Sequence, residues 1–207
     1  MENGRTKTKG RQVLLINDLA GYGKVALSAM IPVLSHMGHH IYNLPTALVS
    51  NTLDYGKFDI LETTDYIRNT ICVWKELGFH FDAVSTGFIV SDVQAKMIAD
   101  FCREQRKAGM VIFVDPIMGD DGKLYNGITE QTIAHMKELV RVSDYMVLNY
   151  TEAAYLAGMK YNPEGQTLLD STKKAMDTVS TLIERNKDNE DKFKGIPLET
   201  CLEVLEA

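Results

Sequence analysis

A chain of 207 residues, 45% hydrophobic and 24% charged, is long enough to bury a core as one globular domain. Its formal net charge of −6 argues against a general nucleic-acid-binding protein, and no apolar run reaches the roughly 20 residues that a membrane helix needs. The three cysteines lie far apart and form no C-x-x-C pair, which predicts a reducing, cytoplasmic setting and no zinc site.

Strands and helices are predicted to alternate along the chain. The expected order is strand 12–17, helix 24–37, strand 41–49, helix 63–77, strand 83–86, helix 91–108, strand 110–114, helix 129–140, strand 142–147 and a short helix ending at Gly158. Ser91-x-x-Gln94 predicts a capping box, and glycines that follow helices predict left-handed C-terminal caps. Repeated βα units predict an α/β fold, a mostly parallel sheet flanked by helices on both faces.

The two ends of the chain differ from this pattern. Residues 1–11 are basic and lack a long apolar segment, so we expect a disordered tail and no signal peptide. Residues 12–207 are expected to form a single domain. After Gly158 the alternation stops, and only helices are predicted, at about 169–183 and from Pro197 onward.

Polar side chains follow two of the predicted strands. Asp115 and Asp120 come directly after strand 110–114, and Asn149 and Glu152 follow strand 142–147. Ligands of open α/β sheets bind at the carboxyl ends of the strands, and Mg²⁺ needs only one or two carboxylates beside waters and phosphates. Taken singly, Asp115-Pro116 could be a turn and Glu152 a first-turn helix acid. Together they favour a metal–phosphate site.

The segment Gly21-Tyr22-Gly23-Lys24-Val25-Ala26 matches the looser dinucleotide-binding pattern GxGxxA. Residues 17–20 separate the predicted strand from the first glycine, so the turn is not tight, and no acidic residue ends the second strand. A flexible turn with a capping role is favoured. A nucleotide-binding oxidoreductase stays open as a rival, which failure to bind NAD(H) would remove.

The motifs resemble, in their order, those of pyridoxal kinases of the ribokinase-like superfamily. They are Ile16-Asn17-Asp18-Leu19, Gly21-Tyr22-Gly23-Lys24, Pro45-Thr46-Ala47, Ser50-Asn51, Ser85-Thr86-Gly87-Phe88, Val114-Asp115-Pro116-Ile117-Met118-Gly119-Asp120 and Asn149-x-x-Glu152-Ala153. The resemblance implies ATP-dependent phosphorylation of the 5′-hydroxymethyl group of pyridoxal, pyridoxine or pyridoxamine, with Mg²⁺, by a cytoplasmic homodimer. Hydroxymethylpyrimidine kinases share the fold and are the nearest alternative.

The resemblance also implies two groups of site residues. Those on the substrate side are Asp18, Thr52, Leu53 and Phe88. Those on the nucleotide side are Asp115, Asp120, Tyr125, Asn149 and Glu152, of which Asp115 and Glu152 are also expected at the metal.

One family motif is absent from the sequence, the Gly-Thr-Gly-Asp segment that supplies an anion hole and the catalytic aspartate. We therefore name no catalytic residue. The family's C-terminal strands are also expected to be missing, as if a block had been removed near 165–166. Loss of a general base alone typically costs about 10²–10⁴-fold in rate. We expect impaired turnover, and a non-catalytic pyridoxal-binding protein is the alternative from another class.

Overall fold

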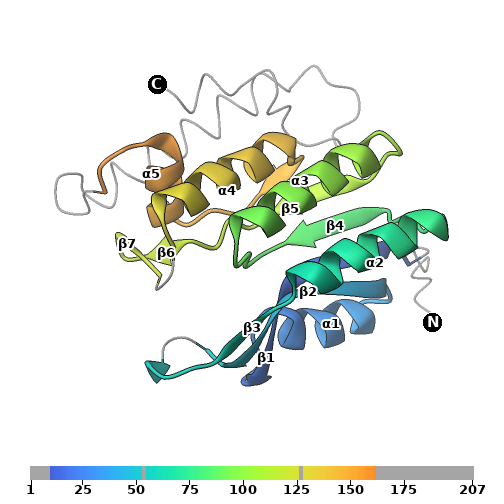
Figure 1. Ribbon diagram of the computed structural model, residues 1–207, viewed down its shortest axis with the longest axis horizontal. Coiled ribbons are helices and arrows are strands. Elements are labelled where there is room, and N and C mark those ends of the chain that lie inside the picture. The colour runs from blue at the N-terminus through green and yellow to red at the C-terminus, as the bar shows by residue number, and fades with distance from the viewer. Residues whose placement is uncertain (1–9, 53–54, 126–127, 162–207) are drawn as a thin grey trace, which may run out of the picture.

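The computed structural model describes residues 10–52, 55–125 and 128–161, and its centre is a twisted sheet (Figure 1). The sheet runs in the order β3-β2-β1-β4-β5-β8, and all neighbouring pairs are parallel except the antiparallel pair β2–β3. Its strands are β1 (Gln12–Tyr22), β2 (His40–Asn51), β3 (Ile60–Glu62), β4 (Ala83–Thr86), β5 (Val111–Val114) and β8 (Tyr145–Met146). A separate hairpin joins β6 (Gly119–Asp120) to β7 (Lys123–Leu124).

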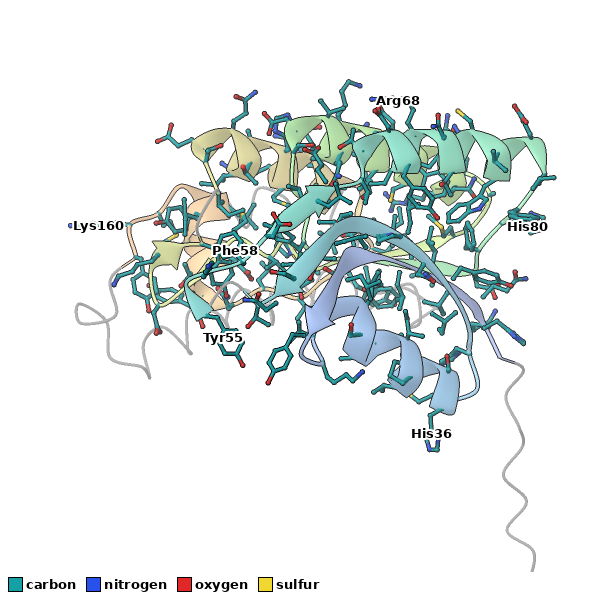
Figure 2. The ribbon with its side chains drawn as sticks, turned by 60° about the horizontal axis from the view of Figure 1, so that its bottom comes forward. His36, Tyr55, Phe58, Arg68, His80 and Lys160 are labelled. Carbon is teal, nitrogen blue, oxygen red and sulfur yellow. The ribbon has the colours of Figure 1, made fainter. Side chains whose placement is uncertain are left out.

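Helices cover both faces of the sheet, as predicted. They are α1 (Ala26–His36), α2 (Thr64–Glu76), α3 (Asp92–Arg106), α4 (Glu130–Val142) and α5 (Tyr150–Ala157). Helices α2, α3 and α4 lie in a row on one face, and α1 lies on the other face against β1 and β2 (Figure 2). The predicted mostly parallel sheet with helices on both faces is therefore confirmed.

The main hydrophobic core lies between the sheet and the row formed by α2, α3 and α4. Ile67 and Ile71 of α2 are buried in this core, with Trp74 packed against it, as their spacing on one helix face predicts. The strands contribute alternate residues, which point to one side of a pleated sheet. The buried strand residues of this core are Leu14, Ile16, Leu44, Val84, Ile112 and Val114.

Several element bounds differ from the prediction. Strand β1 continues to Tyr22 instead of ending at Asn17, because it pairs with β2 over almost its whole length. The strand predicted at 142–147 is only Tyr145–Met146, since Val142 still belongs to α4. Strand β3 and the β6–β7 hairpin were not predicted, because two or three residues are too short to show a period.

The glycines that follow helices were predicted correctly. Gly38, Gly78, Gly109 and Gly158 have φ of 90°, 67°, 94° and 66°, the left-handed conformation in which a side chain is strained. Each of them turns the chain from a helix back toward the next segment.

The pairing of β2 with β1 is irregular near the carboxyl end of β4. Asn17 pairs with Pro45 but Leu19 pairs with Leu48, so β2 has one residue more than β1 in this interval. As a result two successive residues, Thr46 and Ala47, are both fully buried. Bulges of this kind re-aim side chains and are frequent beside functional sites.

Some predictions fall outside the described residues. These are residues 1–9 of the tail predicted at 1–11, Leu53, the helices predicted after Gly158 from about 169 onward, and the altered junction near 165–166. Within residues 10–52, 55–125 and 128–161, the structure contains no helix that is long and apolar enough to cross a membrane.

Candidate functional site

The polar residues predicted after β5 and β8 meet at the start of α5. Asn149 is the N-cap of this helix, and its side-chain oxygen accepts a hydrogen bond from the Glu152 backbone N–H at 2.9 Å. The Glu152 carboxylate in turn accepts from the Asn149 backbone N–H at 2.9 Å, which completes a capping box. This reciprocal pair fixes both side chains at the carboxyl edge of the sheet.

Glu152 also ties α5 to the segment that follows β5. It is only 4% exposed, and its second carboxylate oxygen accepts a hydrogen bond from the Met118 backbone N–H at 3.2 Å. Glu152 is therefore an acid in the first turn of α5, as predicted. The same carboxylate additionally positions the Asp115–Asp120 segment.

Asp115 lies half-buried directly after β5, where its backbone N–H donates to the Thr86 carbonyl at 3.1 Å. Burial raises the pKa of the Asp115 carboxyl to about 6, and the negative charge of Glu152 adds to the rise. Burial likewise raises the pKa of Glu152, against the hydrogen bonds from Asn149 and Met118, and the charge of Asp120 raises it further. Three acids therefore act on one another at this edge, which a bound cation would relieve.

The β6–β7 hairpin carries the remaining residues predicted on the nucleotide side. Asp120 is exposed, and the Tyr125 backbone N–H donates to the Met118 carbonyl at 2.9 Å. The Asn149 side-chain NH₂ donates to the Gly119 carbonyl at 2.8 Å. The structure thus brings all five predicted nucleotide-side residues into one region, around the hairpin and the start of α5.

Of the residues predicted on the substrate side, Asp18 lies within β1, just beyond the part that pairs with β4, while Phe88 follows β4 and Thr52 follows β2. Asn17 connects two of these strand ends, because its side-chain oxygen accepts from the backbone N–H of Asp18 at 3.0 Å and of Phe88 at 2.8 Å. Burial raises the pKa of the Asp18 carboxyl. Thr52 follows β2 and lies near Gly23, whereas Leu53 is outside the described residues.

The glycine-rich segment does not form the turn that we expected. Gly21 lies inside β1, so no residues separate the strand from the motif. Gly23, with φ of 108°, makes the actual turn. The predicted capping role is not seen in α1, where the N-cap residue Val25 makes no side-chain capping bond.

Three polar side chains near the ends of β1, β2 and β4 are buried but were not predicted as site residues: Asn17, Thr46 and Gln94. The sequence feature that could have indicated their burial is a polar residue at the end of an apolar run, or on a helix face that is otherwise apolar. Gln94 was predicted to cap the Ser91 backbone. One half of the predicted capping box is present, since the Ser91 hydroxyl accepts from the Gln94 N–H at 3.5 Å. The other half is not, because the Gln94 side chain turns inward to the Thr46 carbonyl at 2.8 Å.

The donor set fits a hydrated Mg²⁺ better than a metal held by protein alone. Among the described residues no group of three or more His, Cys, Asp or Glu side chains could enclose a metal ion. Asp115 and Glu152 offer carboxylates that repel each other, and Mg²⁺ usually keeps several waters and binds phosphates. Both Glu152 oxygens already accept backbone hydrogen bonds, so Asp115 is the better candidate for direct contact.

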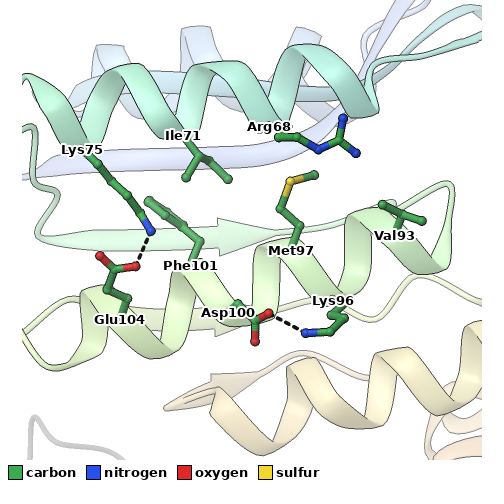
Figure 3. Close-up of a pocket in the computed structure, with 9 residues that line it drawn as sticks. All are labelled: Arg68, Ile71, Lys75, Val93, Lys96, Met97, Asp100, Phe101 and Glu104. Carbon is green, nitrogen blue, oxygen red and sulfur yellow. Dashed lines mark hydrogen bonds and ion pairs between the residues drawn. The ribbon is translucent and has the colours of Figure 1, made fainter.

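A groove between α2 and α3, about 380 Å³ in volume, lies away from these residues (Figure 3). Ile71, Met97 and Phe101 line it. Its charged rim is matched within the chain, since Lys96 pairs with Asp100 at 2.8 Å and Lys75 pairs with Glu104. The groove contains none of the predicted site residues, so the strand ends remain the candidate site.

Comparisons with known proteins point to the same family as the motifs. No protein-family model matches the chain. The chain is 26% identical over 159 residues to the pyridoxal kinase PdxY of Burkholderia mallei, covering 72% of this chain and 54% of the relative. The chain therefore spans about half the length of such curated relatives.

Solved structures agree. A Bacteroides thetaiotaomicron protein, described as a phosphomethylpyrimidine kinase and crystallised with pyridoxal, is 33% identical with a TM-score of 0.76, covering 84% of this chain and 60% of that one. Pyridoxal kinase from Leishmania donovani in complex with ADP is 26% identical with a TM-score of 0.68, covering 79% and 56%. In sequence and in its ribokinase-like fold, the chain resembles the pyridoxal kinases, as its motifs predicted.

Proposed function

We propose that the chain is a vitamin B6 kinase of ribokinase-like fold that uses ATP and Mg²⁺ to phosphorylate the 5′-hydroxymethyl group of pyridoxal, pyridoxine or pyridoxamine. Support comes from the pyridoxal kinases to which it is similar, one of them crystallised with ADP. A cytoplasmic location and a homodimer remain predictions of the family resemblance.

The observation that carries the proposal is the position of the predicted substrate residues in the sheet. The chain runs from β1 to β2 on one side and then returns to β4, β5 and β8 on the other side. The order therefore reverses between β1 and β4, and open α/β sheets bind their ligands in the crevice at such a switch point. Asp18 lies in β1 just beyond the end of its pairing with β4, Phe88 follows β4, and Asn17 joins the two.

The predicted nucleotide residues lie one strand further along the same edge. Asp115 follows β5, which is the neighbour of β4, and its backbone N–H donates to Thr86 at the end of β4. An acceptor alcohol at the switch point and a phosphate near Asp115 would thus be neighbours. Phosphoryl transfer depends on such positioning and on charge stabilisation more than on covalent chemistry.

Each predicted residue has a defined task in this proposal. Asp18 and Phe88 would contact the pyridine ring, with Thr52 and Leu53 beside it. Asp115 would hold hydrated Mg²⁺, and Glu152 would orient the Asp115–Asp120 segment through Met118. Asp120, Tyr125 and Asn149 would line the nucleotide. When bound, Mg²⁺ would neutralise phosphate charge.

We further propose that turnover by the 207-residue chain is impaired. The sequence contains no Gly-Thr-Gly-Asp segment, and its one Gly-Asp pair, Gly119-Asp120, lies in the β6–β7 hairpin. Removing one oxyanion-type donor costs about 10²–10³-fold, and removing a general base about 10²–10⁴-fold. Binding of the vitamer should survive better than catalysis.

A hydroxymethylpyrimidine kinase is the second candidate. It is favoured by the 33% identity to the Bacteroides thetaiotaomicron protein described as a phosphomethylpyrimidine kinase. Both substrates are small aromatic heterocycles with a hydroxymethyl group, so direct competition is needed to separate them.

The test is to incubate the purified chain, with its intact mass confirmed, with pyridoxal and Mg·ATP and to follow pyridoxal phosphate. Titrations with pyridoxal, hydroxymethylpyrimidine and NADH are made on the same preparation. We expect pyridoxal binding with slow or no turnover. Turnover comparable to full-length kinases would contradict the impairment, and preference for hydroxymethylpyrimidine or NADH would contradict the assigned substrate.

A further inference from the structure

The loop between β4 and α3, residues 87–91, is held by buried polar side chains from three different elements. We propose that Thr46, together with Asn17 and Gln94, acts as a set of positioning residues that fixes Phe88 beside the pyridine ring of the substrate. This inference rests on the proposed function, because it assigns the ring to the crevice between β1 and β4.

Both backbone polar groups of Phe88 are bound by side chains. Its N–H donates to the Asn17 side-chain oxygen at 2.8 Å, and its carbonyl accepts from the Thr46 hydroxyl at 2.7 Å. Asn17 comes from β1 and Thr46 from β2, so the two bonds hold one residue from separate strands. The backbone of Phe88 therefore cannot shift without breaking a partly buried hydrogen bond.

Gln94 extends the same network from α3. Its side-chain NH₂ donates to the Thr46 carbonyl at 2.8 Å, and its side-chain oxygen accepts from the Val90 N–H at 3.3 Å. Gln94 and Thr46 are both 0% exposed. Beyond this point Ser91 donates to the Glu62 carboxylate at 2.7 Å, which ties the far end of the loop to β3.

Two unusual backbone features make the network possible. The extra residue in β2 allows Thr46 and Ala47 to be buried in succession, which places the Thr46 hydroxyl beneath the loop. Glycine at 87 allows Asn17 to approach, since a Cβ atom there would lie 2.2 Å from the Asn17 side-chain nitrogen. Both features lie at the switch point.

A fold-stabilising role alone does not account for this arrangement. Apolar side chains of similar shape fill a core at least as well as buried polar groups, which cost free energy unless they are fully paired. Here the pairing converges on the one loop that carries a predicted substrate contact. Asn17 also accepts from the Asp18 N–H, so the network sets the spacing of both predicted ring contacts. A prearranged loop loses less conformational freedom when a ligand binds.

The test compares Thr46→Val, which keeps the side-chain shape but removes the hydroxyl, with Thr46→Ser, which restores it. Ser143→Ala is the matched control, because the Ser143 hydroxyl is also buried and donates to a backbone carbonyl, that of Val140, at 2.7 Å. Hydrogen exchange of the 87–91 amides reports on the loop without any ligand. Dissociation constants for pyridoxal and for Mg·ADP report on the two halves of the site.

For Thr46→Val we expect faster exchange in 87–91 and about tenfold weaker pyridoxal binding, the effect of about 1.4 kcal/mol. Mg·ADP binding should be unchanged, Thr46→Ser should recover most of the affinity, and Ser143→Ala should change neither readout. Unchanged exchange in Thr46→Val would overturn the network. Faster exchange with unchanged pyridoxal affinity would overturn the positioning role. A different result would overturn the proposed function: wild-type protein that does not bind pyridoxal, although Thr46→Val still speeds hydrogen exchange in 87–91.

Discussion

Asp115 is held where its protonated form is favoured, since burial raises its pKa from 3.8 to about 6. Below pH 3.8 the Asp115 carboxyl is protonated in both the folded and the unfolded chain, so it does not destabilise the fold there. Its unfavourable contribution grows as the pH rises and is complete above about 6. The half-exposed carboxyl is partly screened by solvent, so we expect Asp115→Asn to stabilise the fold by about 1 kcal/mol at about pH 8 and hardly at about pH 4.

Urea unfolding at the two pH values measures this difference. Asp65→Asn is the control, because this side chain is 88% exposed and its replacement should have only a small effect on the free energy of unfolding. Equal effects of Asp115→Asn at both pH values would show that burial does not disfavour the charged carboxyl.

Glu152 has a structural task that is separate from any ligand. Replacing it with alanine leaves the Met118 and Asn149 backbone N–H groups without their partner, so we expect a loss of about 2 kcal/mol in the free energy of unfolding. Glu152→Gln keeps one acceptor oxygen and should lose less. Glu130, the exposed first-turn acid of α4, is the control, and its replacement by alanine should cost about 0.5 kcal/mol.

Urea unfolding of Glu152→Ala, Glu152→Gln and Glu130→Ala measures these losses in the free energy of unfolding. Similar losses for Glu152→Ala and Glu130→Ala would mean that Glu152 acts only through the helix dipole.

The residues that were correctly predicted to be neighbours share one property, which is that each lies within a few residues of the end of an apolar strand. Asp115 could be placed at the sheet edge for this reason, as could Asn149 and Glu152. Thr46 and Gln94 could not be found in the same way. Their partners lie 42 and 48 positions away in the chain, and a one-residue irregularity in β2 turns Thr46 inward.

Among the elements, the β6–β7 hairpin depends on a close backbone contact at Gly119. A Cβ atom there would lie 2.2 Å from the Lys123 carbonyl oxygen, so Gly119→Ala should force the hairpin open. The Gly119 carbonyl would then move away from the Asn149 side chain, which it contacts at 2.8 Å. We expect a loss of about 2 kcal/mol in stability and weaker Mg·ADP binding, with pyridoxal binding unchanged.

Gly109→Ala is the control for this prediction. Gly109 has φ of 94° with nothing within 4 Å of an added Cβ, so its replacement should cost about 1 kcal/mol through backbone strain alone. Calorimetric titration with Mg·ADP separates the two variants. Loss of nucleotide affinity in both would mean that lower stability, and not the hairpin, is the cause.

The same contrast explains which elements the sequence could predict. Helix α2 has a repeating apolar face and was placed to within a residue or so at each end. The hairpin strands are two residues long and arise from one tight turn and its contacts with α5, for which the local sequence carries no period. Strand β1 was predicted too short because its last residues gain their pairing from β2.

At the scale of the whole molecule, one sheet edge carries two predicted half-sites on separate strands. The residues predicted at the pyridine ring lie at β1 and β4, and those predicted at the nucleotide lie at the end of β5, in and beside the hairpin and at the start of α5. The long β1–β2 pairing and the parallel neighbours β4 and β5 keep the two halves in a fixed relation. The sequence predicted this order of units, but not that the switch point lies at the β1–β4 crevice.

This arrangement predicts that the two ligands stabilise the protein independently. A ligand at a hundred times its dissociation constant adds about 2.7 kcal/mol to the stability, and contributions from sites that do not share contacts add to within about 0.5 kcal/mol. We therefore expect pyridoxal and Mg·ADP together to raise the free energy of unfolding by the sum of their separate effects, measured by urea unfolding at fixed multiples of each dissociation constant.

Two variants test which strand ends bind each ligand, by showing which ligand no longer raises the free energy of unfolding. Asp115→Asn should remove most of the Mg·ADP increment and keep that of pyridoxal, because both Glu152 oxygens already accept backbone hydrogen bonds and Asp115 is the carboxylate proposed to contact Mg²⁺. Gly87→Ala should do the reverse, since an added Cβ displaces Asn17 from between Asp18 and Phe88. A Mg·ADP increment that survives in Asp115→Asn would move the nucleotide away from the end of β5, and a pyridoxal increment that survives in Gly87→Ala would move the ring away from the switch point.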